Sequence, residues 1–297
     1  MTRLLSLLLL GTAFGCAWAD DAGHPVTMWK VQGETNSIYL LGSIHLLRPE
    51  DHPLPDAIDV AYDDADVIVM ELDMDDLDPV YTQAAFNKAG VMTDGTTLRD
   101  LMGDDLYAEA EKAAAVIDIP LDLLAQSEPW LAAMTVELMM LYRSGFNPGL
   151  GVEMTMTTRA SADGKPIEGL ETIDEQLAFL DGLPIEAQRE MLLQTLLESA
   201  DLADSIDELV DAWHHGDTAV LEAGLLDAIE EQAALYDALI TSRNRRWATT
   251  IAAWLDDDRD YLVVVGALHL VGDEGVPALL SDQGIGIHQL SEPAGLR

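Results

Sequence analysis

The segment YLLGSIHL, residues 39–46, has a close counterpart in VVVGALHL, residues 263–270. Each copy is an apolar run that ends in Gly-x-x-His, with His45 in the first and His269 in the second. An apolar run of this kind predicts a strand buried on both faces, and the glycine lets the backbone turn sharply or approach a ligand. A histidine just past the carboxyl end of such a strand lies where open α/β sheets hold their functional groups. The repeat therefore predicts two related strands that each present one histidine.

A third apolar run, residues 67–70, is followed directly by Glu71. Two imidazoles and a carboxylate form a nitrogen and oxygen site that suits a divalent metal ion and leaves room for water. We therefore predict His45, Glu71 and His269 as metal ligands. The alternative is that each histidine is a hydrogen-bonded structural residue and that Glu71 only caps the next loop.

Strand patterns occupy both ends of the chain, and helical patterns occupy the middle. The predicted strands are residues 27–31, 37–41, 67–70, 165–171, 261–265 and 285–290. This distribution predicts an α/β fold with a mixed sheet core built from two related halves, and with a large helical insertion at about residues 79–255.

The predicted helix at about residues 230–255 carries an arginine within its apolar stripe. The stripe consists of Tyr236, Ile240, Arg243, Trp247, Ile251 and Trp254. A buried guanidinium must be paired, since burial of an unpaired charge costs several kcal/mol. Glu71, Glu153 and Glu171 are the candidate partners; alternatively, Arg243 reaches water past its aromatic neighbour.

The residues that follow Arg243 are also polar. Asn244 is placed to hydrogen-bond a substrate or a ligand carboxylate, whereas Arg245 and Arg246 are expected at the surface.

Composition excludes several functional classes. The 297 residues contain 54 Asp and Glu against 15 Lys and Arg, a formal net charge of −39. Nucleic-acid binding and a polybasic hold on a membrane surface both need clustered positive charge, so neither is expected. The negative charge instead favours cationic ligands, including metals.

The N-terminus has the pattern of an export signal. An apolar run at residues 4–14 and the Ala-x-Ala at 17–19 predict a signal peptide of residues 1–19, which leaves a mature domain of residues 20–297. We therefore expect an exported protein, periplasmic or secreted, with lipid anchoring through Cys16 as the less favoured alternative. No later stretch reaches about 18 uninterrupted apolar residues, so no integral membrane span is expected in the mature chain.

These motifs together resemble the TraB/GumN family, whose animal relatives are the Tiki metalloproteases. The matching pieces are residues 41–45, 69–71, 149–153, 165–166, 169–172, 176–177, 243–244, 247 and 265–269. The resemblance implies a duplicated α/β core with paired Gly-x-x-His motifs that face one cleft. It also implies a divalent-metal-dependent peptidase activity, with manganese or cobalt favoured; the donor types alone leave zinc possible.

The leading hypothesis is an exported, metal-dependent hydrolase, a peptidase that acts on a peptide or another small substrate. The residues predicted to assist the metal are Glu171, Glu153, Arg243 and Asn244. One of the two glutamates is the general base or a further ligand, while the arginine and the asparagine steady an oxyanion or orient a carboxylate. Two alternatives stay open: a non-catalytic exported protein that binds metal, haem or peptide, and a metal-free esterase-like hydrolase with His45 as its base.

Overall fold

The structure is a computed structural model that describes residues 24–200, 202–226, 229 and 232–292. The predicted signal peptide and Cys16 lie outside this part of the chain. The described residues form one six-stranded sheet with the order β4-β3-β5-β2-β1-β6. The strands are β1 (Pro25–Gln32), β2 (Ser37–Ser43), β3 (Val67–Leu72), β4 (Ile167–Glu171), β5 (Tyr261–Gly266) and β6 (Ile287–Ser291). The predicted mixed α/β fold is thereby confirmed.

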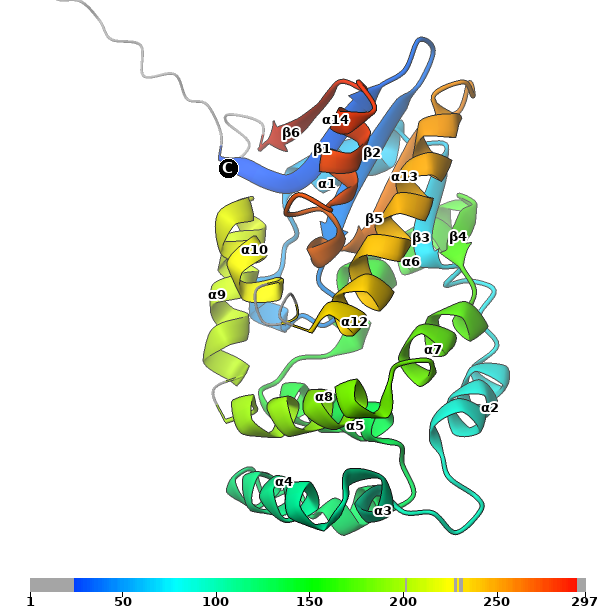
Figure 1. Ribbon diagram of the computed structural model, residues 1–297. Coiled ribbons are helices and arrows are strands. Elements are labelled where there is room, and N and C mark those ends of the chain that lie inside the picture. Colours follow the sequence, from blue (N-terminus) through cyan, green and yellow to red (C-terminus); the bar gives the residue numbers. More distant parts are fainter. Residues whose placement is uncertain (1–23, 201, 227–228, 230–231, 293–297) are drawn as a thin grey trace, which may run out of the picture.

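The sheet is parallel on one side and antiparallel on the other. Strands β4, β3, β5 and β2 run parallel, while β1 is antiparallel to β2 and to β6. Every residue of β2 and β5 is buried, which is why both read as continuous apolar runs. Since the four parallel strands point the same way, their carboxyl ends meet at one edge of the sheet (Figure 1).

The two Gly-x-x-His strands are direct neighbours in the sheet, but they pair one residue out of step. Ser43 pairs with Gly266, and Gly42 pairs with Val265. The two glycines that correspond in sequence therefore do not face each other. Because side chains alternate between the faces of a sheet, corresponding residues of the two copies point to opposite faces.

Helices cover both faces of the sheet and gather beyond its carboxyl edge. The helices are α1 (Asp56–Asp64), α2 (Pro79–Gly90), α3 (Leu98–Met102), α4 (Asp104–Val116), α5 (Pro129–Arg143), α6 (Val152–Asp163), α7 (Ile173–Asp181), α8 (Ile185–Glu198), α9 (Leu202–His214), α10 (Thr218–Leu225), α12 (Ala233–Tyr236), α13 (Ser242–Trp254) and α14 (Val276–Asp282). In Figure 1, α13 and α14 lie in front of the strands and α1 and α6 behind them. Helices α2, α5, α7 and α8 lie below the carboxyl edge, with α3 and α4 farther away (Figure 1).

The helical region has a core of its own. Apolar side chains of α3, α4, α5 and α8 form a buried cluster separate from the one around the sheet. Helices α2 to α13 all fall between Pro79 and Trp254, and β4 lies within this stretch as a strand of the main sheet. No helix in the described ranges is long and apolar enough to cross a membrane.

The helix predicted at about residues 230–255 is present from Ala233 to Trp254 with helical backbone throughout, but its hydrogen-bond pattern changes within it. A π-helical turn, Asp237–Thr241, separates α12 from α13. Such turns insert one residue into the helical repeat and are frequent at functional sites. Here the turn directly precedes the helix that carries Arg243.

Candidate functional site

The carboxyl edge of the parallel strands brings the predicted site residues together. Strand β2 ends at Ser43, two residues before His45, and β3 carries Glu71 near its end. Strand β4 ends at Glu171, and β5, between β3 and β2, ends at Gly266. Residues more than 200 positions apart in the sequence thus become neighbours.

His45 is held by the N-terminus of α6. Its Nδ1 lies 2.8 Å from Oε1 of Glu153, in the first turn of that helix, and the Ser43 hydroxyl donates to the same oxygen. The backbone N–H of Val152 donates to the carbonyl of Ile44 at 3.1 Å, which docks the helix on the segment before the histidine. The His45 side chain is 57% exposed, so it faces an open space.

The contact with Glu153 decides which nitrogen of His45 carries the proton. The negative charge of Glu153 raises the pKa of His45 to about 9. Burial would raise the pKa of Glu153, but His45 and the Ser43 hydroxyl outweigh burial and lower it. An ionised carboxylate only accepts hydrogen bonds, so Nδ1 is the protonated nitrogen whenever His45 is neutral. The lone pair of a neutral His45 is then on Nε2.

Gly151 permits the close approach of α6 to His45. A Cβ at this position would lie 2.0 Å from the backbone oxygen of His45. We expect Gly151→Ala to lower the free energy of unfolding by about 1–3 kcal/mol, because the backbone has to move apart. Urea unfolding measures this loss. Gly286→Ala is the control, since no atom lies within 4 Å of its added Cβ; equal stability of the two variants would contradict the prediction.

The neutral ring of His269 has the same tautomer as that of His45, in a buried setting. Its Nδ1 lies 2.7 Å from Oδ1 of Asn244, whose Nδ2 donates to the carbonyls of His269 and Glu274. Because the amide nitrogen is committed to two acceptors, Oδ1 is the acceptor and Nδ1 of His269 the donor. The residue is 1% exposed, and this burial lowers the pKa of His269 to about 3. His269 is therefore neutral at pH 7, with its lone pair on Nε2.

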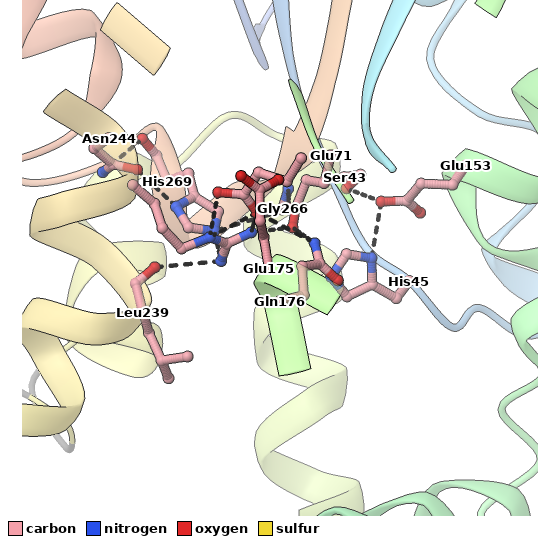
Figure 2. A network of polar contacts seen from close by, with 12 residues as sticks. Ser43, His45, Glu71, Glu153, Glu175, Gln176, Leu239, Asn244, Gly266 and His269 are labelled. Atoms are coloured by element: carbon pink, nitrogen blue, oxygen red, sulfur yellow. Dashed lines mark hydrogen bonds and ion pairs between the residues drawn. The ribbon is translucent and has the colours of Figure 1, made fainter. Parts of the chain in front are cut away.

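Glu71 lies between the two histidines in Figure 2. Its Oε1 accepts the backbone N–H of Gly266 at 2.8 Å, and its Oε2 accepts from Arg243 at 2.6 Å and from Gln176 at 3.2 Å. Burial would raise the pKa of Glu71, but the surrounding positive groups and the Gly266 N–H hold it at about 2. Since His269 is neutral at pH 7, the closest positive partner of Glu71 is Arg243. Glu71 is thus an ionised carboxylate in a largely buried place.

Arg243 is paired, as the sequence predicts, and its partners are Glu71 and Glu171. Its Nη2 lies 2.8 Å from Oε2 of Glu171, whose side chain is 0% exposed. Arg246, the next turn along, also binds Glu171, although its own side chain is 45% exposed. Glu153, the third candidate partner, binds His45 instead. Two guanidinium groups hold Glu171, which gives it a positioning role.

The space above Gly266 is surrounded by the three predicted ligands. A Cβ there would lie 3.4 Å from Oε1 of Glu71, 3.5 Å from Nε2 of His45 and 3.6 Å from Cδ2 of His269. Glycine leaves this position unfilled. Both imidazoles use Nδ1 for an oxygen acceptor and keep Nε2 for another partner, which is the usual arrangement of metal-binding histidines. The donor set therefore fits a divalent cation in chemistry and in tautomer.

The guanidinium of Arg243 occupies part of this space. Its Nη1 lies 3.1 Å from Nε2 of His269. Among the residues that the structure describes, no three His, Cys, Asp or Glu side chains stand at metal-ligand spacing. A cation bound by both histidines and Glu71 would therefore have to replace the contact between Arg243 and His269.

His45 lines several cavities, two of which bear on the binding of a substrate. The first has a volume of ≈ 280 Å³, and its lining includes His45, Glu71, Glu153 and Gln176. The second is a groove of ≈ 910 Å³ between α2, α5 and α6, with a mostly apolar lining. Both are lined by His45, Met74 and Met154, so they are adjacent. The site therefore has room for an extended substrate.

Two further polar residues join the site without having been predicted to do so. Gln176 bridges Glu71 and, at 3.5 Å, Glu171. Its place among the matching pieces of the TraB/GumN resemblance was the sequence signal. In the structure, the Thr172 to Glu175 capping box starts α7 directly after β4, and Gln176 lies in the turn that follows. Arg246 is exposed, as expected, but it lies one turn from Arg243 on the same helix face, and its guanidinium also reaches Glu171. Arg245 is exposed as well and pairs with Glu274 instead of a site residue.

The fold and the site define an α/β protein in which paired histidines, a buried glutamate and a buried arginine meet at the ends of parallel strands. The chain belongs to the TraB/PrgY/gumN family, whose model matches residues 27–289. It is 24% identical to "Uncharacterized protein YbaP" of Escherichia coli (strain K12) over 267 residues, which cover 89% of this chain and 96% of that protein. It is 23% identical to "Metalloprotease TIKI homolog" of Amphimedon queenslandica, over 97% of this chain and 66% of that protein. No solved structure matches the chain.

Proposed function

We propose that this protein is an exported, metal-dependent hydrolase that cleaves peptide bonds, with a divalent cation held by His45, Glu71 and His269. One observation carries the proposal: both histidines commit Nδ1 to an oxygen acceptor, and both rings lie with Oε1 of Glu71 around the unfilled space at Gly266. The likeness to a protein named as a metalloprotease supports the reaction class. Nitrogen and carboxylate donors without thiolate suit manganese or cobalt, with zinc as the alternative.

When bound, the cation would act as a Lewis acid on the substrate carbonyl and make water a better nucleophile at neutral pH. In hydrolysis the C–N bond breaks, the hydroxyl of water joins the carbonyl carbon and the remaining proton goes to the nitrogen. Glu153 keeps the Nδ1 proton on His45 and thereby fixes the orientation of its ring. Asn244 does the same for His269.

The remaining predicted catalytic residues have positioning roles. Arg243 compensates the charges of Glu71 and Glu171, which are largely or fully buried. Asn244 is 0% exposed and uses its amide for His269 and a carbonyl of the next loop, so it is a positioning residue for His269. Glu171 positions Arg243. Of the two glutamates considered as general base, Glu153 is the one beside the open cavity.

Metal removal tests the proposal. We expect the purified protein with manganese to cleave an unstructured peptide, to lose this activity in EDTA and to regain it when manganese is restored. EDTA saturated with calcium is the control for effects of the chelator itself. Metal binding without cleavage would support a binding protein instead. If the protein neither binds manganese nor cleaves the peptide, the assignment is rejected.

A second candidate is a metal-free hydrolase with His45 as its general base. The contact of Arg243 with His269 favours it, because a guanidinium already lies where the cation would bind. Glu153 holds Nδ1 of His45, so Nε2 can take a proton from water in those molecules whose ring is neutral, a fraction that grows as the pH rises towards 9. This candidate predicts full activity in EDTA, and the same experiment therefore separates the two.

A further inference from the structure

A small apolar pocket also borders His45, and it shares no other lining residue with the 280 Å³ cavity. Its volume is ≈ 140 Å³. Ser43, His45 and Gly266 line part of it, and residues of α9 and α10 line another part. The apolar lining residues of those two helices are Ile206, Leu209, Val210 and Leu225.

The pocket suits one apolar group of limited size. An engineered cavity of about 150 Å³ with an aliphatic and aromatic lining stays dry and binds benzene. Apart from His45, the side chains in this lining carry no titratable group, and the Ser43 hydroxyl is committed to Glu153. A leucine or phenylalanine side chain therefore matches the pocket in both size and polarity, whereas a charged side chain would lose its hydration there.

The position of the pocket relative to the groove fixes which part of a substrate reaches it. Pocket and groove are both lined by His45, Leu46 and Leu141. A chain that lies in the groove of ≈ 910 Å³ can thus place one side chain in the pocket at the point where its backbone passes His45.

We propose that this pocket is the specificity pocket of the enzyme, and that it holds a leucine- or phenylalanine-sized side chain of an extended peptide next to the bond that is cleaved. The inference rests on the proposed function of the His45 site, and it adds the substrate class. Ile206 and Leu225, which are half-buried on the helical wall, set the depth available to that side chain.

Filling the pocket tests the inference. Peptides that differ only in one residue, Ala, Leu, Phe or Asp, are compared by kcat/KM in the presence of manganese. We expect the wild type to prefer Leu or Phe over Ala by about 10–200-fold. Ile206→Phe, with Leu225→Phe as a second variant, should remove this preference. Ile285→Phe is the matched control, since Ile285 is also half-buried against the main core but does not line the pocket.

A binding measurement keeps this test separate from that of the proposed function. N-acetyl-L-leucinamide, added to the metal-free protein and followed by methyl chemical shifts, should bind the wild type and Ile285→Phe but not Ile206→Phe. This binding pattern supports the proposed side-chain pocket even if no peptide is cleaved. The absence of cleavage would reject only the proposed hydrolase activity. Equal cleavage of the Ala and Leu peptides, or no binding of the amide to the wild type, overturns the pocket.

Discussion

Arg243→Ala is expected to lower the free energy of unfolding by about 3–5 kcal/mol. The side chain is 7% exposed and bonds both Glu71 and Glu171, whose side chains are 15% and 0% exposed. Removal of the guanidinium leaves two carboxylates without their main positive partner. The free energy of unfolding falls because these buried negative charges are no longer compensated. Arg246 still binds Glu171, but it does not bind Glu71. Urea unfolding followed by circular dichroism measures the loss.

The same helix supplies the control. Arg245→Ala removes a side chain that is 63% exposed and paired with Glu274 at the surface, so we expect a loss of about 0–1 kcal/mol. Arg243→Lys keeps the charge but cannot reproduce the forked contacts to both carboxylates, and should fall between the two alanine variants. Similar stability of Arg243→Ala and Arg245→Ala would show that Glu71 and Glu171 do not depend on this guanidinium.

His45→Ala should reduce kcat/KM by about 10²–10⁴-fold, the range for loss of an acid or base group. This expectation holds whether Nε2 binds a cation or accepts a proton from water. His45→Asn distinguishes a loss of activity from a loss of stability. Its amide nitrogen lies near the position of Nδ1 and can still donate to Glu153, but the variant has no counterpart of Nε2. We therefore expect His45→Asn to be as inactive as His45→Ala. Its urea unfolding should stay close to that of the wild type.

The control for this series is His288→Asn, since His288 is an exposed residue of β6, which lies at the opposite edge of the sheet from β4. It should retain wild-type kcat/KM. Metal content, measured by elemental analysis, then distinguishes the two candidate functions. Loss of bound manganese in His45→Asn supports the cation site, and retained hydrolysis in this variant would reject both assignments of His45.

Much of the framework could be predicted because it depends on local patterns. The apolar runs that end in Gly-x-x-His are readable as buried strands, and their position in a parallel sheet places both histidines at one edge. The pairing of Arg243 was also predictable, since a guanidinium in an apolar helical stripe must meet a carboxylate. These inferences need only the residue types and their spacing.

The choice of partners could not be predicted, because it depends on how distant elements dock. Glu153 binds His45 and not Arg243, since α6 approaches the β2 end through Gly151. The π-helical turn before α13 sets the direction of Arg243, and its sequence, Asp237–Thr241, shows no break in the helical pattern. The approach of Arg243 to His269 follows from that geometry, and it is the fact that most affects the metal proposal.

The one-residue offset between β2 and β5 places the two copies of the Gly-x-x-His motif in different environments. Because Ser43 faces Gly266 across the sheet, the two copies deliver their histidines into different surroundings, one 57% and the other 2% exposed in its side chain. Neither copy can substitute for the other. The repeated motif in this way forms a single asymmetric centre in place of a symmetric pair. An exchange of the two tripeptides between glycine and leucine should therefore inactivate the protein, even though it leaves the composition unchanged.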